Sequence, residues 1–257
     1  METNPWRVAG VSVQGLNHTR KSVPCQDAHG WRLLPGNVLA AVVSDGAGSA
    51  AMAEVGAQLS VRTALDHAAQ KLAAGAWPDT EKIWREWLME LLETTRAAVF
   101  SEASQRQMPA RELAATLICV LATPAWTVAA QVGDGAVVAG DTPGHWRALT
   151  RPESAEYLNE TTFLVSPGAL DRAQIKLECL RITHLAMFCD GLQMLALKMP
   201  QGEPHLPFFQ PLMRLLDQPT GSPAEEQLSA FLRSPRVGAR TDDDLTLVLA
   251  SRGPTTA

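Results

Sequence analysis

The stretch Val38–Gly46, with the sequence VLAAVVSDG, is a continuous apolar run that ends in a polar Ser-Asp-Gly. Such a run is typical of a strand that is buried on both faces. An aspartate at the end of a buried strand is held rigidly and can still reach a polar cleft. The glycine after it permits a sharp turn or a close approach of another backbone. The stretch therefore predicts that Asp45 lies at the edge of a buried sheet.

The same arrangement of an apolar strand and an Asp-Gly pair occurs twice more in the chain. AQVGDG at residues 130–135 contains Asp134, and MFCDG at 187–191 contains Asp190. Three further acids, 242–244, come directly before the last apolar run, and Asp27 follows a Pro-Cys-Gln turn. Taken singly, an Asp-Gly pair more often marks a turn than a ligand, and an acidic run is more often a solvated loop. Repetition at strand ends, together with the flanking sequence, favours a functional role for these aspartates.

The remaining periodicity predicts two long helices and several strands. One helix is expected over 50–72, and a second begins after Asp79 or Thr80 with an apolar stripe from Trp84 to Val99. A third begins at Ser222-Pro223 and includes Leu228, Phe231 and Leu232. Besides Val38–Val43, strands are expected at 6–13, 115–122, 126–132, 136–139, 145–149, 162–166, 175–181, 184–189 and 245–249. Strands that cluster apart from the long helices indicate an α+β protein with mainly antiparallel sheets.

Length and composition indicate one globular domain over residues 1–257. The chain has 46% apolar residues and a net charge of -5, which gives no electrostatic footprint for nucleic acid or an anionic membrane. No secretory signal is visible at the N-terminus, and the apolar stretch 113–132 is broken by Thr123-Pro124, which favours two strands over a membrane span. The four cysteines lack C-x-x-C spacing, so a reducing cytoplasmic location is expected.

Taken in order, these segments resemble the protein phosphatase 2C family of metal-dependent phosphatases over nearly the whole chain. The matching segments are CQDA at 25–28, VSDGAG at 43–48, ATL at 115–117, VGDG at 132–135, CDGL at 189–192 and DDLT at 243–246. Within the family, His18, PCQD at 24–27 and EYLNET at 156–161 are most similar to a compact bacterial branch.

The resemblance implies a four-layer α-β-β-α sandwich, in which two mainly antiparallel sheets are flanked by helices and metals lie in a cleft at one end. It implies that Asp45 bridges two cations and that the Gly46 carbonyl helps to hold one of them. Asp190 and Asp243 are expected to hold the other cation.

Two further aspartates complete the site that the resemblance implies. Asp27 is expected to act near the first cation, directly or through water, so that Asp27 and Asp45 are the predicted catalytic residues. Asp134 is expected to serve a weaker third cation that it shares with Asp190.

The chemistry of such a site follows from its oxygen ligands. Several carboxylates cannot crowd together in ionised form without positive charge, and oxygen-only ligands favour Mn²⁺ or Mg²⁺ over zinc. Two such ions, roughly 3.5–4 Å apart, can activate a water and clamp an in-line displacement at phosphorus. The predicted function is that of a metal-dependent serine/threonine protein phosphatase, which acts on phosphorylated proteins and opposes a Ser/Thr kinase.

The sequence departs from the family pattern at Gln26, Ala47 and Ser22, and two of these departures bear on metal and phosphate binding. Gln26 stands where many members have glutamate, which predicts weaker binding of one metal. The family's phosphate-binding arginine falls on Ser22, and His18, Arg20 and Lys21 lie close enough to replace it.

Two alternative functions are therefore considered beside the protein phosphatase. One is a catalytically weak phosphatase fold that serves as a binding or scaffold module. The other is a metal hydrolase for a small phosphorylated molecule, although the chain offers no dedicated nucleotide-binding motif.

Overall fold

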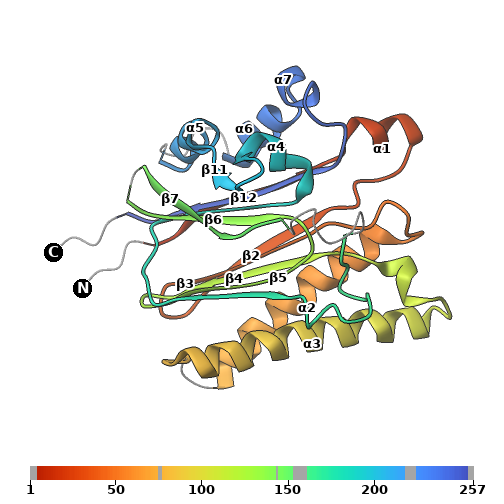
Figure 1. Cartoon of the computed structure of the whole chain (residues 1–257), viewed down its shortest axis with the longest axis horizontal. Helices are drawn as coiled ribbons and strands as arrows, with labels where there is room; N and C mark the ends of the chain where they lie inside the picture. The colour runs from red at the N-terminus through yellow and green to blue at the C-terminus, as the bar shows by residue number, and fades with distance from the viewer. Residues whose placement is uncertain (1–4, 75–76, 143, 153–160, 218–223, 254–257) are drawn as a thin grey trace.

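The computed structural model describes residues 5–74, 77–142, 144–152, 161–217 and 224–253, and within them two five-stranded antiparallel sheets pack face to face. Helices cover both outer faces, so the molecule has the layers α-β-β-α (Figure 1). This arrangement confirms the predicted α+β sandwich.

The lower sheet in Figure 1 has the order β2-β3-β4-β5-β8. Its strands are β2 (Ala28–Leu34), β3 (Val38–Ser44), β4 (Leu117–Ala122), β5 (Thr127–Val132) and β8 (Gln174–Glu178). The upper sheet has the order β1-β12-β9-β6-β7. Its strands are β1 (Arg7–Val13), β12 (Leu245–Ser251), β9 (His184–Phe188), β6 (Ala136–Thr142) and β7 (His145–Thr150). A small hairpin of β10 (Leu197–Lys198) and β11 (Glu203–Pro204) lies outside both sheets.

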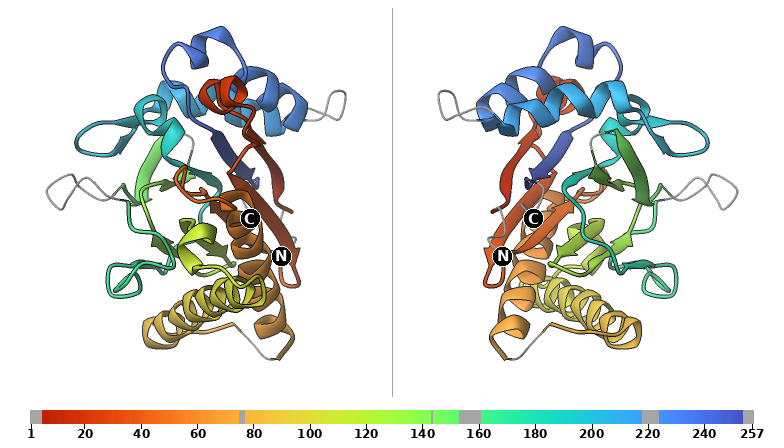
Figure 2. Two further views of the ribbon diagram at one scale, coloured as in Figure 1. Left: turned by 90° about the vertical axis from the view of Figure 1, so that its right-hand side faces the viewer. Right: turned by 90° about the vertical axis from the view of Figure 1, so that its left-hand side faces the viewer.

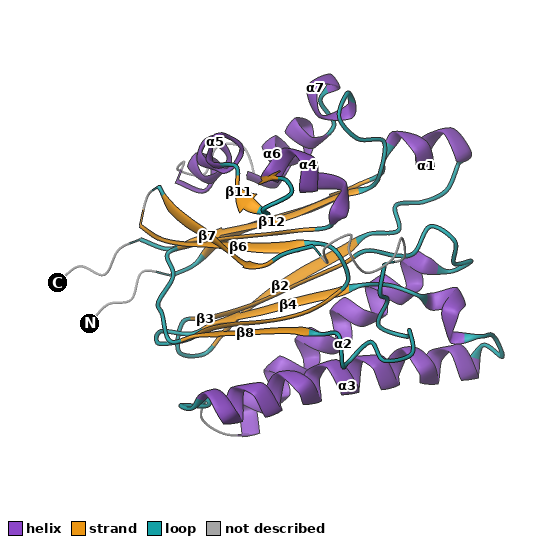
Figure 3. Ribbon diagram, in the orientation of Figure 1, coloured by secondary structure: helices purple, strands orange, loops and turns teal. Residues whose placement is uncertain are grey.

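The helices form two groups, which Figure 3 sets apart from the strands by colour. Under the lower sheet run the long helices α2 (Ala53–Ala74) and α3 (Glu81–Gln105), followed by the 3₁₀ turn η1 (Ala110–Leu113). On the other side lie α1 (Leu16–Lys21), η2 (Asp190–Leu192), α4 (Gln193–Ala196), α5 (Leu206–Asp217), α6 (Ala224–Leu232) and α7 (Pro235–Gly238). Among the described residues, no helix is both long and apolar enough to cross a membrane.

The apolar run of β3 is continuous because both faces of the strand are buried. Leu39, Ala41 and Val43 face the upper sheet and pack with residues such as Met187 and Val248. The alternating residues of the same strand pack against α2 and α3 in a second core. A third core lies between the upper sheet and helices α5 and α6. The strand expected over Val38–Val43 is therefore confirmed as a two-sided buried strand.

The second long helix begins where its cap residue predicts. The Thr80 side chain accepts a hydrogen bond from the Ile83 N–H at 3.4 Å. The predicted apolar stripe from Trp84 to Val99 is buried. For the third helix, α6 begins at Ala224, and the expected Ser222-Pro223 cap lies outside the described residues.

One expected strand is wrong, and the elements that were not anticipated include α5, β2 and α1. Residues 162–166 form no strand. The Ser166 N–H donates to the Phe163 carbonyl in a turn, and the Leu164 N–H donates to the Ala115 carbonyl. Helix α5 was missed because Pro207 and Pro211 lie inside its apolar pattern. Strand β2 and the short helix α1 have too few apolar residues in sequence to stand out.

Candidate metal centre

The acidic residues singled out by the sequence lie at one end of the two sheets, because strand ends of both sheets meet there. Ala28 at the start of β2 pairs with Ser44 at the end of β3, which places Asp27 beside Asp45. In the upper sheet, the end of β9 runs beside the start of β12, since Leu247 pairs with Phe188. Antiparallel pairing therefore brings together residues that are far apart in the chain.

Asp45, Asp134 and Asp190 form the centre of this cluster. They follow β3, β5 and β9, and each offers a carboxylate oxygen within 4.8 Å of the other two. Asp27 and Asp45 interact through a hydrogen bond between their side chains. The cluster therefore combines carboxylates from both sheets, at a spacing that a shared cation could bridge.

Glycines permit the close approach of the segments that carry these aspartates. A Cβ atom on Gly191 would lie 2.2 Å from the Asp244 carbonyl oxygen, so only glycine fits beside Asp190. Gly133, beside Asp134, has a φ of +109°, and a Cβ there would meet the Thr116 side chain at 2.5 Å. The glycines of the Asp-Gly pattern thus serve backbone packing as well as turns.

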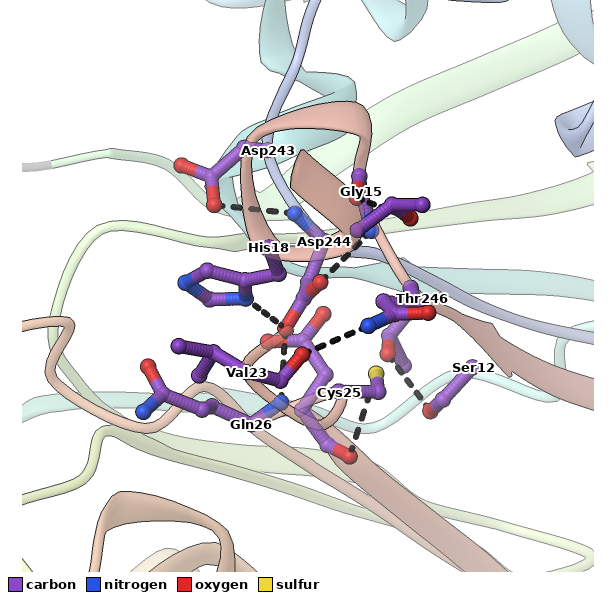
Figure 4. Close-up of polar contacts among 12 residues, drawn as sticks. Ser12, Gly15, His18, Val23, Cys25, Gln26, Asp243, Asp244 and Thr246 are labelled. Carbon is purple, nitrogen blue, oxygen red and sulfur yellow. Dashed lines mark hydrogen bonds and ion pairs between the residues drawn. The ribbon is translucent and has the colours of Figure 1, made fainter. Parts of the chain in front are cut away.

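The two last acids of the 242–244 run have different surroundings. Asp243 is exposed and close enough to Asp190 to raise its pKa by charge repulsion. Asp244 is buried and its Oδ1 accepts a hydrogen bond from the Gly15 N–H at 2.7 Å. Its Oδ2 accepts one from the Gln26 N–H at 2.6 Å and lies 2.8 Å from Nδ1 of His18 (Figure 4). Asp244 therefore anchors the segments before β2 and β12 rather than pointing into the acidic cluster.

A second polar network reaches Asp27 from the upper sheet. The Ser12 hydroxyl lies 2.6 Å from the Thr246 hydroxyl and 2.8 Å from Nδ1 of His29. A hydrogen bond from Thr246 to the Asp27 side chain lowers the pKa of that carboxyl, because it favours the ionised form. Residues of β1, β2 and β12 together therefore hold Asp27 in place.

Burial and mutual repulsion make the cluster a poor place for uncompensated negative charge. Burial, with a smaller contribution from Asp244 and Asp190, raises the pKa of Asp27 to about 7. Burial and the neighbouring Asp134 and Asp243 raise the pKa of Asp190 to about 6. The pKa of Asp45 is also raised well above its usual range, first by burial and then by Asp27 and Asp190. In the described part of the chain, no lysine or arginine forms an ion pair with these three carboxyls.

Buried oxygen atoms without hydrogen-bond partners are a second reason why the cluster suits divalent cations. Oδ2 of Asp27, Oδ1 of Asp134 and Oε1 of Gln26 are buried oxygens that lack a hydrogen-bond partner among the described residues. Buried acceptors without partners are costly, and hard cations or the waters they carry would satisfy them. The donor set consists of oxygen atoms, which suits Mn²⁺ or Mg²⁺.

The three basic residues expected near phosphate lie on α1. His18 approaches the site but its Nδ1 contacts Asp244, a role that the sequence did not indicate. Arg20 and Lys21 are exposed in the last turn of the helix, and within the described chain neither forms a hydrogen bond or ion pair with the acidic cluster. Phosphate binding by these residues stays a prediction.

Comparison with known proteins identifies the family to which this chain belongs. A sequence model described as "Protein phosphatase 2C" matches residues 14–233, a span that contains every carboxylate of the cluster except Asp243. The chain belongs to the protein phosphatase 2C family. It is 34% identical over 252 residues to serine/threonine-protein phosphatase 3 of Escherichia coli strain K12, an alignment that covers 95% of this chain and 98% of the relative.

Solved structures of serine/threonine phosphatases share the fold of this phosphatase 2C chain. The phosphatase Stp1 from Staphylococcus aureus superposes with a TM-score of 0.62 at 17% identity, covering 99% of this chain and 98% of the other. The catalytic domain of the phosphatase PstP, solved in complex with two manganese ions, superposes with a TM-score of 0.63 at 17% identity, covering 96% and 97%. At these identities the structures establish the fold.

Several residues that hold the site together were not found from the sequence. The sequence predicted that Asp244 belongs to a solvated loop, because a run of acidic residues usually lies in such a loop. Ser12 and His29 have no sequence signal. Ser12 meets Thr246 through the pairing of β1 with β12, and His29 meets Ser12 only because the two sheets stack face to face. Thr161, whose hydroxyl donates to Asp134 at 2.7 Å, lies at the end of the family-like EYLNET motif. Residues 156–160 of that motif lie outside the described residues.

Proposed function

We propose that this chain is a metal-dependent serine/threonine protein phosphatase that uses Mn²⁺ or Mg²⁺. The observation that carries the proposal is the approach of Asp45, Asp134 and Asp190 to within 4.8 Å of one another, in a member of the protein phosphatase 2C family. The E. coli relative, which aligns over almost the whole of both chains, supports serine/threonine specificity.

The residues assigned to the cations follow from the cluster and from the family motifs. Asp45 would bridge two ions, helped by the Gly46 carbonyl, and Asp190 and Asp243 would hold one of them. Asp27 would act beside the other ion, and Asp134 with Asp190 would hold a weaker third. Bound cations would supply the Lewis acidity that makes a water molecule nucleophilic at neutral pH.

The chain's own residues orient the reacting groups. Asp27 is held by Thr246 on one side, while its Oδ2 has no partner in the described protein and can accept a hydrogen bond from a water. The amide of Gln26, with its buried and unpartnered Oε1, can orient a second water. No nucleophilic serine or cysteine is needed, since water attacks the phosphorus directly.

The scaffold alternative is not favoured. A degenerate site would be expected to lose at least one central carboxylate, and Asp45, Asp190 and Asp243 are all present at the same end of the sheets. We expect phosphorylated proteins as substrates, an opposing Ser/Thr kinase and a cytoplasmic location.

Hydrolysis of p-nitrophenyl phosphate at increasing Mn²⁺ tests the proposal, with Asp190→Asn as the control variant. We expect turnover that requires Mn²⁺ and falls at least a hundredfold in the variant, because a ligand of the shared cation is lost. Equal rates for the two proteins would refute a metal-dependent phosphatase. Faster turnover of phosphothreonine peptides than of phosphotyrosine peptides or phosphorylated metabolites would separate protein serine/threonine specificity from the small-molecule alternative.

A further inference from the structure

A groove of about 610 Å³ reaches Asp243, whose charge acts on Asp190 of the acidic cluster. Its walls are α1 on one side and the α6–α7 segment on the other, which lie next to each other in Figure 2. Asp243 belongs both to the groove lining and to the acidic cluster. Any ligand in this groove is therefore contiguous with the proposed site of phosphate hydrolysis.

The lining combines an apolar floor with one cationic side chain, Arg233, and one acidic side chain, Asp243. Val13, Leu232 and Leu245 form part of the floor, and Leu16 projects from α1 with 45% of its surface exposed. Among the lining residues that the structure describes, Arg233 is the one positive charge. A mixed apolar and cationic groove of this size can hold a few side chains of an extended peptide.

Arg233 is positioned to receive an anionic group. Its Nε donates to the Ser229 hydroxyl at 3.3 Å, one helical turn earlier, which restricts the guanidinium. Its terminal nitrogens have no protein partner in the described part of the chain, so they are available for a bidentate contact with a carboxylate.

The charge around the groove favours the same kind of ligand. Residues 227–241 contain three arginines, Arg233, Arg236 and Arg240, and no acidic residue. The opposite wall, α1, ends in Arg20 and Lys21. This concentration of positive charge contrasts with the net charge of -5 for the whole chain. It would attract an acidic segment toward the groove.

We propose that this groove binds the substrate segment next to the phosphorylated residue, and that Arg233 selects an acidic side chain there. The inference rests on the proposed phosphatase function, because the bound phosphate must lie at the acidic cluster while the adjoining residues occupy the groove.

The test compares phosphothreonine peptides that differ only in one flanking residue, aspartate or lysine. The residue is placed at each of the three positions before or after the phosphothreonine. We expect wild-type protein with Mn²⁺ to prefer aspartate in kcat/KM by about tenfold at one or more of these positions, the effect of a single charge-assisted contact. Arg233→Glu should abolish or reverse that preference.

Two controls separate the groove from the catalytic centre. Turnover of p-nitrophenyl phosphate, which carries no flanking residue to occupy the groove, should be unchanged in Arg233→Glu. Arg85→Glu, an exposed arginine on α3, should keep the wild-type preference. Normal turnover of the small substrate without an aspartate preference, or with a preference that survives Arg233→Glu or is lost in Arg85→Glu, overturns the inference. Absence of Mn²⁺-dependent turnover in wild-type protein overturns the proposed function itself.

Discussion

At the scale of single residues, the site contains two aspartates, Asp244 and Asp190, that are opposite in role. Asp244 satisfies its oxygens with protein donors, from Gly15, His18 and Gln26. Asp190 instead lies among other carboxyls and is costly to ionise without compensating charge. Asp244 therefore stabilises the fold without a cation, whereas Asp190 is suited to holding one.

Asp190→Asn should therefore separate stability from metal binding. At pH 7.5 and without metal, the variant should be more stable than wild type by on the order of 1–3 kcal/mol, since a carboxyl with a raised pKa is replaced by a neutral amide. Titration calorimetry should show much weaker Mn²⁺ binding. Asp79→Asn, at an exposed position, should change neither quantity. A metal-free Asp190→Asn protein that is less stable than wild type would contradict this account of the cluster.

The Thr246 hydroxyl should affect metal affinity without touching a metal. It links Ser12 to Asp27, and partners that orient a ligand commonly change metal affinity by about 10- to 100-fold. We expect Thr246→Val to weaken Mn²⁺ binding by about tenfold in calorimetry. Thr94→Val, on the exposed side of α3, is the matched control. An unchanged Mn²⁺ affinity in Thr246→Val would mean that the network does not orient Asp27.

At the scale of elements, the strand ends carry the candidate site, and they were partly predictable. The run Val38–Val43 identifies β3 and places Asp45 at its end, because two-sided burial leaves a clear apolar signature. Helix α5 was not predictable in the same way, since its prolines oppose the pattern of Phe208, Leu212 and Leu216. The role of Asp244 was hidden because its partners come from segments more than two hundred residues away.

Gly191→Ala tests the packing between two strand ends. Its new methyl group would collide with the Asp244 carbonyl, so the loop after β9 must shift away from the start of β12. We expect a loss of stability of about 1–3 kcal/mol in denaturant unfolding, together with weaker Mn²⁺ binding. Gly48→Ala is a matched control, because a Cβ there has nothing within 4 Å. Equal stability of the two variants would show that the close approach at Gly191 is unimportant.

At the scale of the whole molecule, the site lies across the two sheets, so its charge affects the stability of the entire sandwich. Asp45 and Asp134 come from the lower sheet, and Asp190 and Asp243 come from the upper one. No local sequence pattern could establish that these segments meet. The family resemblance supplied that expectation, and its physical basis is the antiparallel pairing and stacking of the sheets.

The metal-free protein should lose stability as the pH rises from 5.5 to 7.5. The pKa of Asp27 is raised from 3.8 to about 7, and that of Asp190 from 3.8 to about 6. In this window the unfolded chain has already released these protons while the folded chain retains part of them, so raising the pH favours unfolding. Added Mn²⁺ compensates the charge, and its increase in Tm should be larger at pH 7.5 than at pH 5.5. An equal increase at both values would contradict this prediction.

The most direct test of the acidic cluster as a metal centre is anomalous diffraction from crystals grown with MnCl₂. We predict at least two manganese peaks at the common end of the sheets, with Asp45 coordinating both and Asp190 coordinating one. Crystals of Asp190→Asn should lose or weaken the peak next to that residue. A wild-type map without manganese at Asp45 and Asp190, at a concentration that supports full turnover of p-nitrophenyl phosphate, would contradict the central claim.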